Sequence, residues 1–568
     1  MNNIMKRSAL LFTLILTFAF SFGQTDKKTT PKGWHLMDEA TDGYFGISTD
    51  KAYDFVKSKK LKSNTVIVAV IDSGVDTLHE DLKSILWKNP GEIPGNGIDD
   101  DKNGYVDDVY GWNFLGGKDG ENVEKDSYEA ARVYHNLKEK YDGKEIDKNS
   151  LSPDELFEYE MWKRAEAEVA GSDSKTNSFD LIMIKRFYNT CLKNDSLLQI
   201  AMGKEKYTGK ELGAFEPEDA ELKKAKKMLY DLMAGNDALE TTNEEFLEGF
   251  GDYVSSEESK AEAGSKAPEN YRGEVVKDNY SDFNDKFYGN NNVMVSNKAA
   301  LHGTHVSGII AAARDNKLGM DGVADNVRIM SLRAVPDGDE HDKDIALAIR
   351  YAVDNGARVI NMSFGKSFSP EKKWVDDAVK YAESKGVLLV HAAGNDAKDL
   401  DNSFNYPSST YLADGKKATN WITVGASGDP TAGGYTASFS NYGKKEVDVF
   451  APGVKIYSTV PGGDTYSSLQ GTSMASPVVA GLAAFIMEYF PTLSAQQVKM
   501  VIEKSAQPTG EKVKNPGTGE MVDFSELSRT GGIVNAYEAA KLASTLKGEW
   551  KDAQPQKTKS TIKKLDKN

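Results

Sequence analysis

Residues 65–74 read Thr-Val-Ile-Val-Ala-Val-Ile-Asp-Ser-Gly. The first seven positions form an uninterrupted apolar and β-branched run, which is typical of a strand buried on both faces of a parallel sheet. The run ends in Asp72, and an acid at the carboxyl end of such a strand lies where open α/β sheets place their chemistry. Because Asp-Ser-Gly also favours a turn, these residues alone leave Asp72 open between a functional acid and a turn residue.

Strands and helices alternate through the second half of the chain. We expect strands at 327–332, 358–363, 387–392, 421–425 and 448–450, and helices at 342–354, 370–384, 474–490, 494–505 and 533–543. Such alternation is typical of a parallel sheet with helices on both faces. The predicted fold class is therefore α/β, with a doubly wound and mostly parallel sheet formed by residues 65–117 and 293–545.

The segment between those two ranges, residues 118–292, is charged and helix-forming and has few strand signals. Ser152-Pro153-Asp154-Glu155 combines a capping box with proline at the first helical position, which predicts a helix to about Ala170. Further helices are expected at 179–192 and 217–234, and a flexible polar link at 255–267. We therefore predict a helical insertion in the α/β domain.

Composition and the first residues of the chain bear on location and partners. The 568 residues carry a formal net charge of -16, which disfavours non-specific nucleic-acid binding and suits a protein with cation sites. Lys6 and Arg7 precede an apolar run at 9–20 that is too short for a membrane anchor, so residues 1–23 are read as a secretory signal peptide. We expect an exported protein, in a periplasm or outside the cell, without stable membrane association after signal cleavage. Residues 24–64 are an N-terminal extension, and the lysine-rich residues 546–568 are expected to be a disordered tail.

An acidic, glycine-containing loop offers calcium ligands. Cys191 is the only cysteine, so no intrachain disulfide is possible, and bound calcium is a candidate source of rigidity. If Asp99 is position 1 of a calcium loop, oxygen ligands fall at positions 3, 5 and 9, which are Asp101, Asn103 and Asp107. Position 12 is Tyr110 where an EF-hand has glutamate, so a complete EF-hand is not expected. A partial calcium site and a solvated acidic turn both remain open.

Two other segments begin helices with reactive side chains. Gly471-Thr-Ser-Met-Ala-Ser-Pro477 precedes a buried helical run and places Ser473 at or just before a helix N-terminus, where free N–H groups favour an anion. Ser473 is open between a nucleophile and an ordinary N-cap. His302-Gly-Thr-His305 also begins a helix. These histidines are open between a general base, a structural pair and part of a zinc site, for which no third ligand is evident.

Taken together, these three groups are the parts of a nucleophilic triad. The serine needs a base to remove its proton, and the base needs a buried carboxylate that fixes its tautomer and stabilises the imidazolium. The chain order Asp72, His302, Ser473 is one of three orders in which this chemistry occurs.

The motifs resemble those of subtilisin-like serine proteases, the subtilase family (peptidase S8). The matching segments are Val70-Ile-Asp-Ser-Gly74, His302-Gly-Thr-His-Val306, Ala392-Ala-Gly-Asn395 and Gly471–Pro477, within residues 34–115 and 293–545. The resemblance implies a subtilisin-type sheet, a secreted serine endopeptidase that acts on protein or peptide substrates, and no organic cofactor. It assigns Asp72, His302 and Ser473 to the catalytic triad and Asn395 to the oxyanion hole.

The resemblance also implies where substrate binds. Ser363, Phe364 and Gly365 are similar to the strand that binds the substrate backbone and lines the pocket for the residue before the scissile bond. Gly394 belongs to the opposite wall of that pocket. A pocket of this kind implies broad specificity with an apolar preference.

A second calcium site is implied in the same way. Asp81 follows Asp72 by nine residues, as the calcium aspartate of the family does. The loop at 315–320 resembles the segment that supplies the other ligands, the Asn316 side chain and the carbonyls of Leu318 and Met320. The helix before that loop is one residue longer than usual, so the register of these ligands is open.

The chain departs from the family pattern in two ways. His302 follows Asp72 by 230 residues, where a few dozen are usual, and the insertion at 118–292 fills the gap. Only about 40 residues lie between the signal peptide and the first core strand, which does not accommodate the usual folding propeptide. The insertion is open between a passive surface excursion and a lid, a substrate-selecting arm or a partner site. We hypothesise that it assists folding or self-inhibition; normal refolding and cleavage with a short linker in its place would refute this.

Two other functions are considered. One is a catalytically silent or zymogen-locked peptide-binding protein on the same fold, which a serine-directed irreversible reagent would distinguish. The other is an esterase of the α/β-hydrolase type. That fold requires Gly-x-Ser-x-Gly and the order Ser, Asp, His, whereas here Ala475 replaces the second glycine and the order differs.

Overall fold

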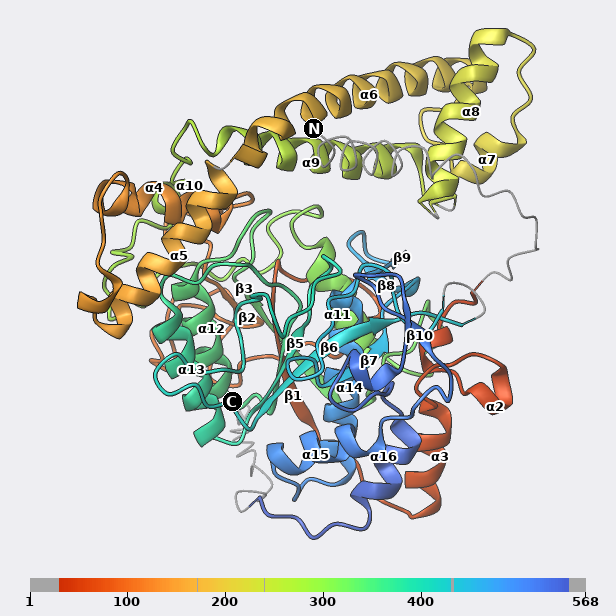
Figure 1. Ribbon diagram of the computed structural model, residues 1–568. Coiled ribbons are helices and arrows are strands. Elements are labelled where there is room, and N and C mark those ends of the chain that lie inside the picture. Colours follow the sequence, from red (N-terminus) through yellow and green to blue (C-terminus); the bar gives the residue numbers. More distant parts are fainter. Residues whose placement is uncertain (1–29, 171, 237, 240, 431–433, 551–568) are drawn as a thin grey trace, which may run out of the picture. The chain divides into compact units, whose positions relative to one another are not determined.

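The computed structural model describes residues 30–170, 172–236, 238–239, 241–430 and 434–550 (Figure 1). The described residues divide into two compact units, one of residues 30–129 and 269–550 and one of residues 130–268. The expected signal peptide at 1–23 and the expected tail from 551 lie outside the described residues. Within the described ranges, none of the helices has the length and apolar character needed to span a bilayer.

The first unit contains a seven-stranded sheet in which every neighbouring pair is parallel. The spatial order is β2-β3-β1-β4-β5-β6-β7. The strands are β1 Val66–Asp72, β2 Gly111–Asn113, β3 Val327–Arg333, β4 Val359–Met362, β5 Leu388–Ala392, β6 Trp421–Ser427 and β7 Val449–Pro452. The prediction of a doubly wound parallel α/β fold is confirmed, and the strand at 65–71 is β1, third from one edge.

The burial of β1 explains why its apolar run is continuous. Val66, Val68 and Val70 pack in one core with helices α11 (Leu301–Ala311) and α14 (Thr472–Tyr489). Ala69 and Ile71 face a second core, which α12 (Asp342–Asp354) and α13 (Lys372–Ser384) cover from the other side. Because both faces of the strand are covered, its middle positions are all apolar and do not alternate between apolar and polar residues.

Three helices near the ends of the chain complete this unit. Helix α3 (Thr49–Ser58) packs beside α16 (Ala536–Ala543), and α15 (Ala495–Ser505) begins with a capping box of Ser494 and Gln497. Shorter elements are η1 Trp34–Leu36, α2 Glu39–Asp42, α10 Tyr271–Val276, η3 Phe524–Glu526, and the antiparallel pairs β8 Ile456–Val460 with β9 Thr465–Leu469 and β10 Val513–Lys514 with β11 Met521–Val522. The sequence did not predict β2 or these two hairpins, because their residues are few or largely polar.

The second unit, here called the insert unit, is helical in its described residues. Its elements are α4 Glu129–Tyr141, η2 Lys148–Ser150, α5 Pro153–Val169, α6 Ser172–Met202, α7 Gly209–Ala214, α8 Ala220–Gly235 and α9 Asn243–Glu262. Ser152 caps α5 with the predicted reciprocal bonds to Glu155, which confirms that helix start. Cys191, Leu198, Leu212 and Leu229 lie in the unit's own small core.

Three predictions about segments and their bounds are corrected, two for the insert unit and one for the C-terminal tail. The flexible link expected at 255–267 is wrong, because α9 continues to Glu262 and its Glu258 pairs with Lys185 of α6 at 2.5 Å. Residues 118–129 and 269–292 belong to the sheet unit instead of the insert, since their charged side chains make buried ion pairs there. The tail begins later than 546, because the Trp550 N–H donates to the Thr492 carbonyl.

Candidate active site

Asp72 and His302 meet at the carboxyl end of the sheet. Asp72 is the last residue of β1 and is 2% exposed, and His302 is the second residue of α11. The Nδ1 atom of His302 lies 2.7 Å from Oδ1 of Asp72, which also accepts the Ser73 N–H at 2.7 Å. A buried carboxylate bonded to Nδ1 fixes the tautomer that leaves Nε2 free to take a proton.

Asp72 also changes the basicity of His302. Burial by itself lowers the pKa of His302, but the negative charge of Asp72 and its hydrogen bond more than compensate, so the pKa lies above the ordinary value of 6.5. The imidazole side chain is 36% exposed, so substrate can reach it. A histidine of this kind is a stronger base than a free one.

Ser473 lies in the first turn of the central helix α14. The N-cap of that helix is Gly471, with no side-chain cap, so the alternative that Ser473 is an N-cap is wrong. The Ser473 hydroxyl donates to the Ser363 carbonyl at 3.0 Å, and the Ser363 hydroxyl donates to the Ser473 carbonyl at 2.9 Å. Between Ser473 and His302, both in the described part of the chain, no hydrogen bond is formed. For its proton to reach His302, the serine hydroxyl would have to turn away from Ser363.

Asn395 is held with its amide oxygen turned inward. Its Oδ1 accepts the Thr472 N–H at 2.8 Å and the Thr472 hydroxyl at 3.0 Å. The Gly394 N–H donates in turn to the Thr472 hydroxyl at 3.0 Å. Because the oxygen is occupied, the Nδ2 group is the end of Asn395 that can donate to a developing negative charge. Thr472, which sequence reasoning missed, orients this side chain.

The residues expected at the two substrate walls follow adjacent parallel strands. Ser363 and Gly365 come directly after β4, and Gly394 comes after β5. A Cβ at Gly365 would lie 2.3 Å from Oδ1 of Asn405, and one at Gly394 would lie 2.5 Å from Nδ2 of Asn441. Both glycines therefore leave room that asparagine side chains fill. Asn405 donates to the carbonyls of Ala392 and Ala393 at 3.1 and 3.0 Å, and no sequence motif indicated it.

Phe364, the middle residue of the first wall, is half-buried and stands next to His391. The two rings meet edge to face at 6.3 Å, and burial lowers the pKa of His391 to about 4. Phe364 in the first wall therefore packs against the neutral, buried imidazole of His391.

His305 is a structural histidine. It is fully buried, its Nε2 lies 3.2 Å from the Ser467 carbonyl, and burial lowers its pKa to about 3. Among the described residues, the one group of acidic, histidine or cysteine side chains close enough to share a metal ion is Glu92, Asp99 and Asp101. It includes neither His302 nor His305, so the two histidines have no third ligand for zinc in the described part of the chain. The zinc alternative is therefore not supported.

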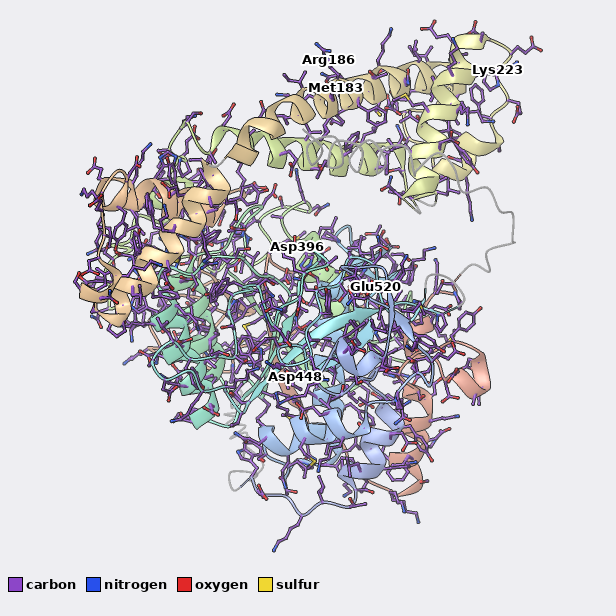
Figure 2. The ribbon with its side chains drawn as sticks, in the orientation of Figure 1. Met183, Arg186, Lys223, Asp396, Asp448 and Glu520 are labelled. Carbon is purple, nitrogen blue, oxygen red and sulfur yellow. The ribbon has the colours of Figure 1, made fainter. Side chains whose placement is uncertain are left out.

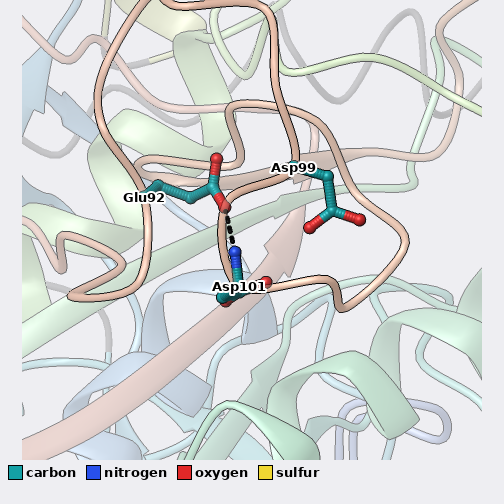
Figure 3. A group of neighbouring side chains, drawn as sticks. All are labelled: Glu92, Asp99 and Asp101. Atoms are coloured by element: carbon teal, nitrogen blue, oxygen red, sulfur yellow. Dashed lines mark hydrogen bonds between the residues drawn. The ribbon is translucent and has the colours of Figure 1, made fainter.

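The acidic loop gathers a different set of side chains from the one predicted. Figure 3 shows Glu92, Asp99 and Asp101, whose ligand oxygens lie within 4.8 Å of one another. Asp107 is not in this group, because its carboxylate accepts the N–H groups of Gly95, Asn96 and Gly97. Asn103 lies beside Asp101, with Nδ2 and Oδ2 3.2 Å apart. Glu92, which precedes the loop in sequence, replaces Asp107 at this position.

The four residues of the second predicted calcium site do come together. Asp81 is fully buried, and its oxygens accept from Asn316 Nδ2 at 2.5 Å, from the Met320 N–H at 3.4 Å and from the Tyr466 hydroxyl at 3.2 Å. The Leu318 N–H donates to Oδ1 of Asn316 at 2.8 Å. No lysine or arginine of the described residues forms an ion pair with Asp81, so its buried charge lacks a cation. The Asp81 carboxylate and the side-chain oxygen of Asn316 are ligands of the kind that a hard divalent ion takes. In this arrangement the N–H groups of Asn316 and Met320 face Asp81.

Comparisons with known proteins agree with this geometry. Residues 63–525 match the family model of the subtilase family, peptidase S8. The chain is 41% identical over 239 residues to "Thermophilic serine proteinase" of Bacillus sp. (strain AK1), covering 42% of this chain and 51% of that protein. It is 42% identical over 213 residues to "Subtilisin DY" of Bacillus licheniformis, covering 37% of this chain and 72% of that protein.

A solved structure titled as proteases from Pseudoalteromonas arctica PAMC 21717 aligns over 43% of this chain and 70% of its own, at 30% identity with a TM-score of 0.34. The aligned part spans about half the length of the Bacillus AK1 proteinase. The family assignment rests on the sequence matches, which cover most of the sheet unit. The chain belongs to the subtilase family, peptidase S8.

Proposed function

We propose that this protein is an exported endopeptidase that cleaves peptide bonds with Ser473 as nucleophile, His302 as general base and Asp72 as the orienting acid. The observation that supports it most is the 2.7 Å contact between His302 and a buried Asp72, with the pKa of the base raised. The signal-like residues 1–23 support a secreted or periplasmic location.

The proposed reaction has two halves. In the first, the Ser473 hydroxyl leaves Ser363, gives its proton to Nε2 of His302, and Oγ bonds to the peptide carbonyl carbon. The Nδ2 group of Asn395 and the N–H of Ser473 receive the oxyanion; first-turn N–H groups of a helix have no acceptor within the helix. His302 then gives the proton to the leaving amine as the C–N bond breaks. In the second half, water attacks the acyl-serine with His302 as base, and the serine is regenerated.

Substrate choice is part of the proposal. Ser363–Gly365, here called the substrate stretch, would bind the substrate backbone, with Gly394 on the opposite wall. The half-buried ring of Phe364 supports acceptance of an apolar side chain before the scissile bond.

We further propose that the protein binds structural calcium. Asp81, the Asn316 side chain and the carbonyls of Leu318 and Met320 would hold one ion, which supplies the cation that the buried Asp81 lacks. For this the Asn316 amide must turn its oxygen to the ion. Glu92, Asp99 and Asp101 would hold a second ion, with Asn103 at the edge (Figure 3).

Casein hydrolysis by purified wild type and by Ser473→Ala, each with and without a calcium chelator, tests the function. Hydrolysis by the wild type alone is expected, and its loss on chelation supports the calcium sites. If the wild type neither hydrolyses casein nor reacts with a serine-directed reagent, even after limited proteolysis of the insert, the proposed function is wrong.

A further inference from the structure

A buried lysine follows the substrate stretch directly. The Lys366 side chain is 2% exposed, and its ammonium lies 2.7 Å from Oε2 of Glu129 and 2.9 Å from Oδ1 of Asp342. It also donates to the Glu340 carbonyl at 2.7 Å. One cation and two carboxylates are thus enclosed together, and such a group tolerates little displacement of its members because an unpaired buried charge is costly.

Glu129 is the residue from which the insert helices start. It is the first residue of α4, which continues into the insert unit, and its side chain is 5% exposed. Its own N–H donates to Oδ2 of Asp339 at 2.8 Å. Lys366, which directly follows Gly365 at the end of the substrate stretch, is therefore paired with the residue from which the insert helices start.

The backbone of Lys366 is linked to the opposite wall through Tyr406 and Asn405. Its N–H donates to the Tyr406 carbonyl at 3.0 Å, and the Tyr406 N–H donates back at 2.8 Å. The neighbouring Asn405 donates from Nδ2 to the carbonyls of Ala392 and Ala393, at 3.1 and 3.0 Å. A shift of Lys366 would move the segment that sets the spacing between the two walls.

The returning end of the insert meets the same helix turn. Arg272 is 2% exposed and bonds to both oxygens of Asp344, at 2.7 and 2.8 Å, and to Asp278 at 2.6 Å. Lys343 pairs with Asp278 at 2.6 Å. Asp342, Lys343 and Asp344 are the first three residues of α12, so one helix turn binds the segments on both sides of the insert.

We infer that Lys366 is a positioning residue: through its buried ion pair with Glu129, it couples the root of the insert to the substrate stretch and holds that stretch in the geometry that binds peptide. The inference rests on the proposed function of Ser363–Gly365. The insert then acts on peptide binding through the chain connection at Glu129.

Glu129→Gln is the sharpest variant. It removes the ionic bond to the insert root while Asp342 still compensates the charge of Lys366, so the fold is kept. Asp448→Asn is the matched control, because Asp448 is also a buried carboxylate paired with a lysine, Lys499 at 3.2 Å, and it belongs to neither wall (Figure 2 labels Asp448).

Both changes are made in full-length protein that carries Ser473→Ala, and the Kd of a fluorescent casein peptide is measured. Glu129→Gln should weaken binding about fivefold or more, a typical size for coupling between sites, and Asp448→Asn should leave it unchanged. Glu129→Asp, which keeps the charge, should recover part of the affinity. In protein that keeps Ser473, Glu129→Gln should raise KM more than it lowers kcat. The rate at which a small serine-directed reagent labels the protein should stay unchanged.

Equal Kd values for Glu129→Gln and its parent, or equal weakening by Asp448→Asn, would overturn the inference, as would the absence of any peptide binding. A wild type that fails to label or cleave refutes the proposed catalysis instead, since the binding arm does not depend on turnover.

Discussion

The imidazole of His302 lies 2.7 Å from the carboxylate of Asp72, although 230 positions separate the two residues in sequence. The acid ends a central strand and the base begins the helix that packs beside it, so the contact is set by the sheet and not by the chain between them. The carbonyl of Gly74 lies 2.1 Å from where a Cβ of Gly303 would stand, which is why α11 approaches the strand end so closely.

The pH profile of activity should report this contact. Because His302 must be neutral to act as a base and its pKa is raised above 6.5, kcat/KM should fall as pH decreases, with a midpoint above 6.5. Asp72→Asn should lower that midpoint and reduce kcat by about 10⁴-fold, as loss of the orienting acid does in triads. A midpoint that does not move in Asp72→Asn would contradict the role given to Asp72.

Asn395→Leu tests the oxyanion donor with a side chain of similar size. It should reduce kcat by about 10² to 10³-fold and change KM little, because the Nδ2 group acts only as negative charge develops. Steady-state kinetics on a peptide amide measures both constants. Since Asn395 also accepts from Thr472, the melting temperature is followed in parallel. A rise in KM with unchanged kcat would place Asn395 in ground-state binding instead.

Three buried imidazoles should make the sheet unit sensitive to acid. Burial lowers the pKa of His35 and His391 to about 4 and that of His305 to about 3, from 6.5. Below pH 6.5 the unfolded chain takes up these protons and the folded chain does not, so the free energy of unfolding falls as pH decreases from 6.5 to about 4. At about 1.4 kcal/mol for each pKa unit, His35 alone accounts for about 3 kcal/mol.

His35→Phe isolates one of the three groups. Neither ring nitrogen of His35 has a hydrogen-bond partner within the described residues, so phenylalanine forfeits no bond. Urea unfolding at pH 7 and pH 4.5 should show a smaller loss of stability for the variant than for the wild type. Equal losses would mean that His35 is not the group that takes up the proton.

Calcium should stabilise the protein through Asp81. An ion that binds only the folded state adds about 2.7 kcal/mol at a concentration one hundred times its Kd. Calcium should therefore raise the melting temperature of the chelator-treated wild type, and Asp81→Asn should remove most of that rise. Glu92→Gln should remove a separate part if the acidic loop binds an ion, with Asp448→Asn as the unaffected control. A rise of wild-type size in Asp81→Asn would refute this site.

The sequence predicted the elements whose burial is uniform along the chain. The run at 65–71 had to be a central strand because both of its faces are apolar, and helix 342–354 was predicted to the residue. The motifs at Asp72, His302 and Ser473 lie at strand or helix ends that follow from those elements. The proximity of Asp72 to His302, and that of Asp81 to Asn316, therefore follows from topology.

Other contacts depend on partners that no local pattern identifies. Glu92 joins Asp99 because the loop folds back over it, while Asp107 turns to the N–H groups of Gly95 and Gly97. Lys366 and Arg272 look like ordinary surface charges in sequence, since a buried ion pair and a solvated one use the same residue types. Only the fold shows that their partners lie across 237 and 72 positions of chain.

The pairing of β1 with β3 also sets the order in which the chain can fold during its synthesis. Val66 pairs with Val327, 261 positions later, so the middle of the sheet cannot close until the whole intervening chain has left the ribosome. At about 5 to 20 residues per second, β1 waits roughly 13 to 50 s for its neighbour. The insert unit, with its own core of Leu198, Leu212 and Leu229, is complete well before then. Its early closure shortens the loose chain that β1 must span, and so lowers the entropy lost when the two strands meet.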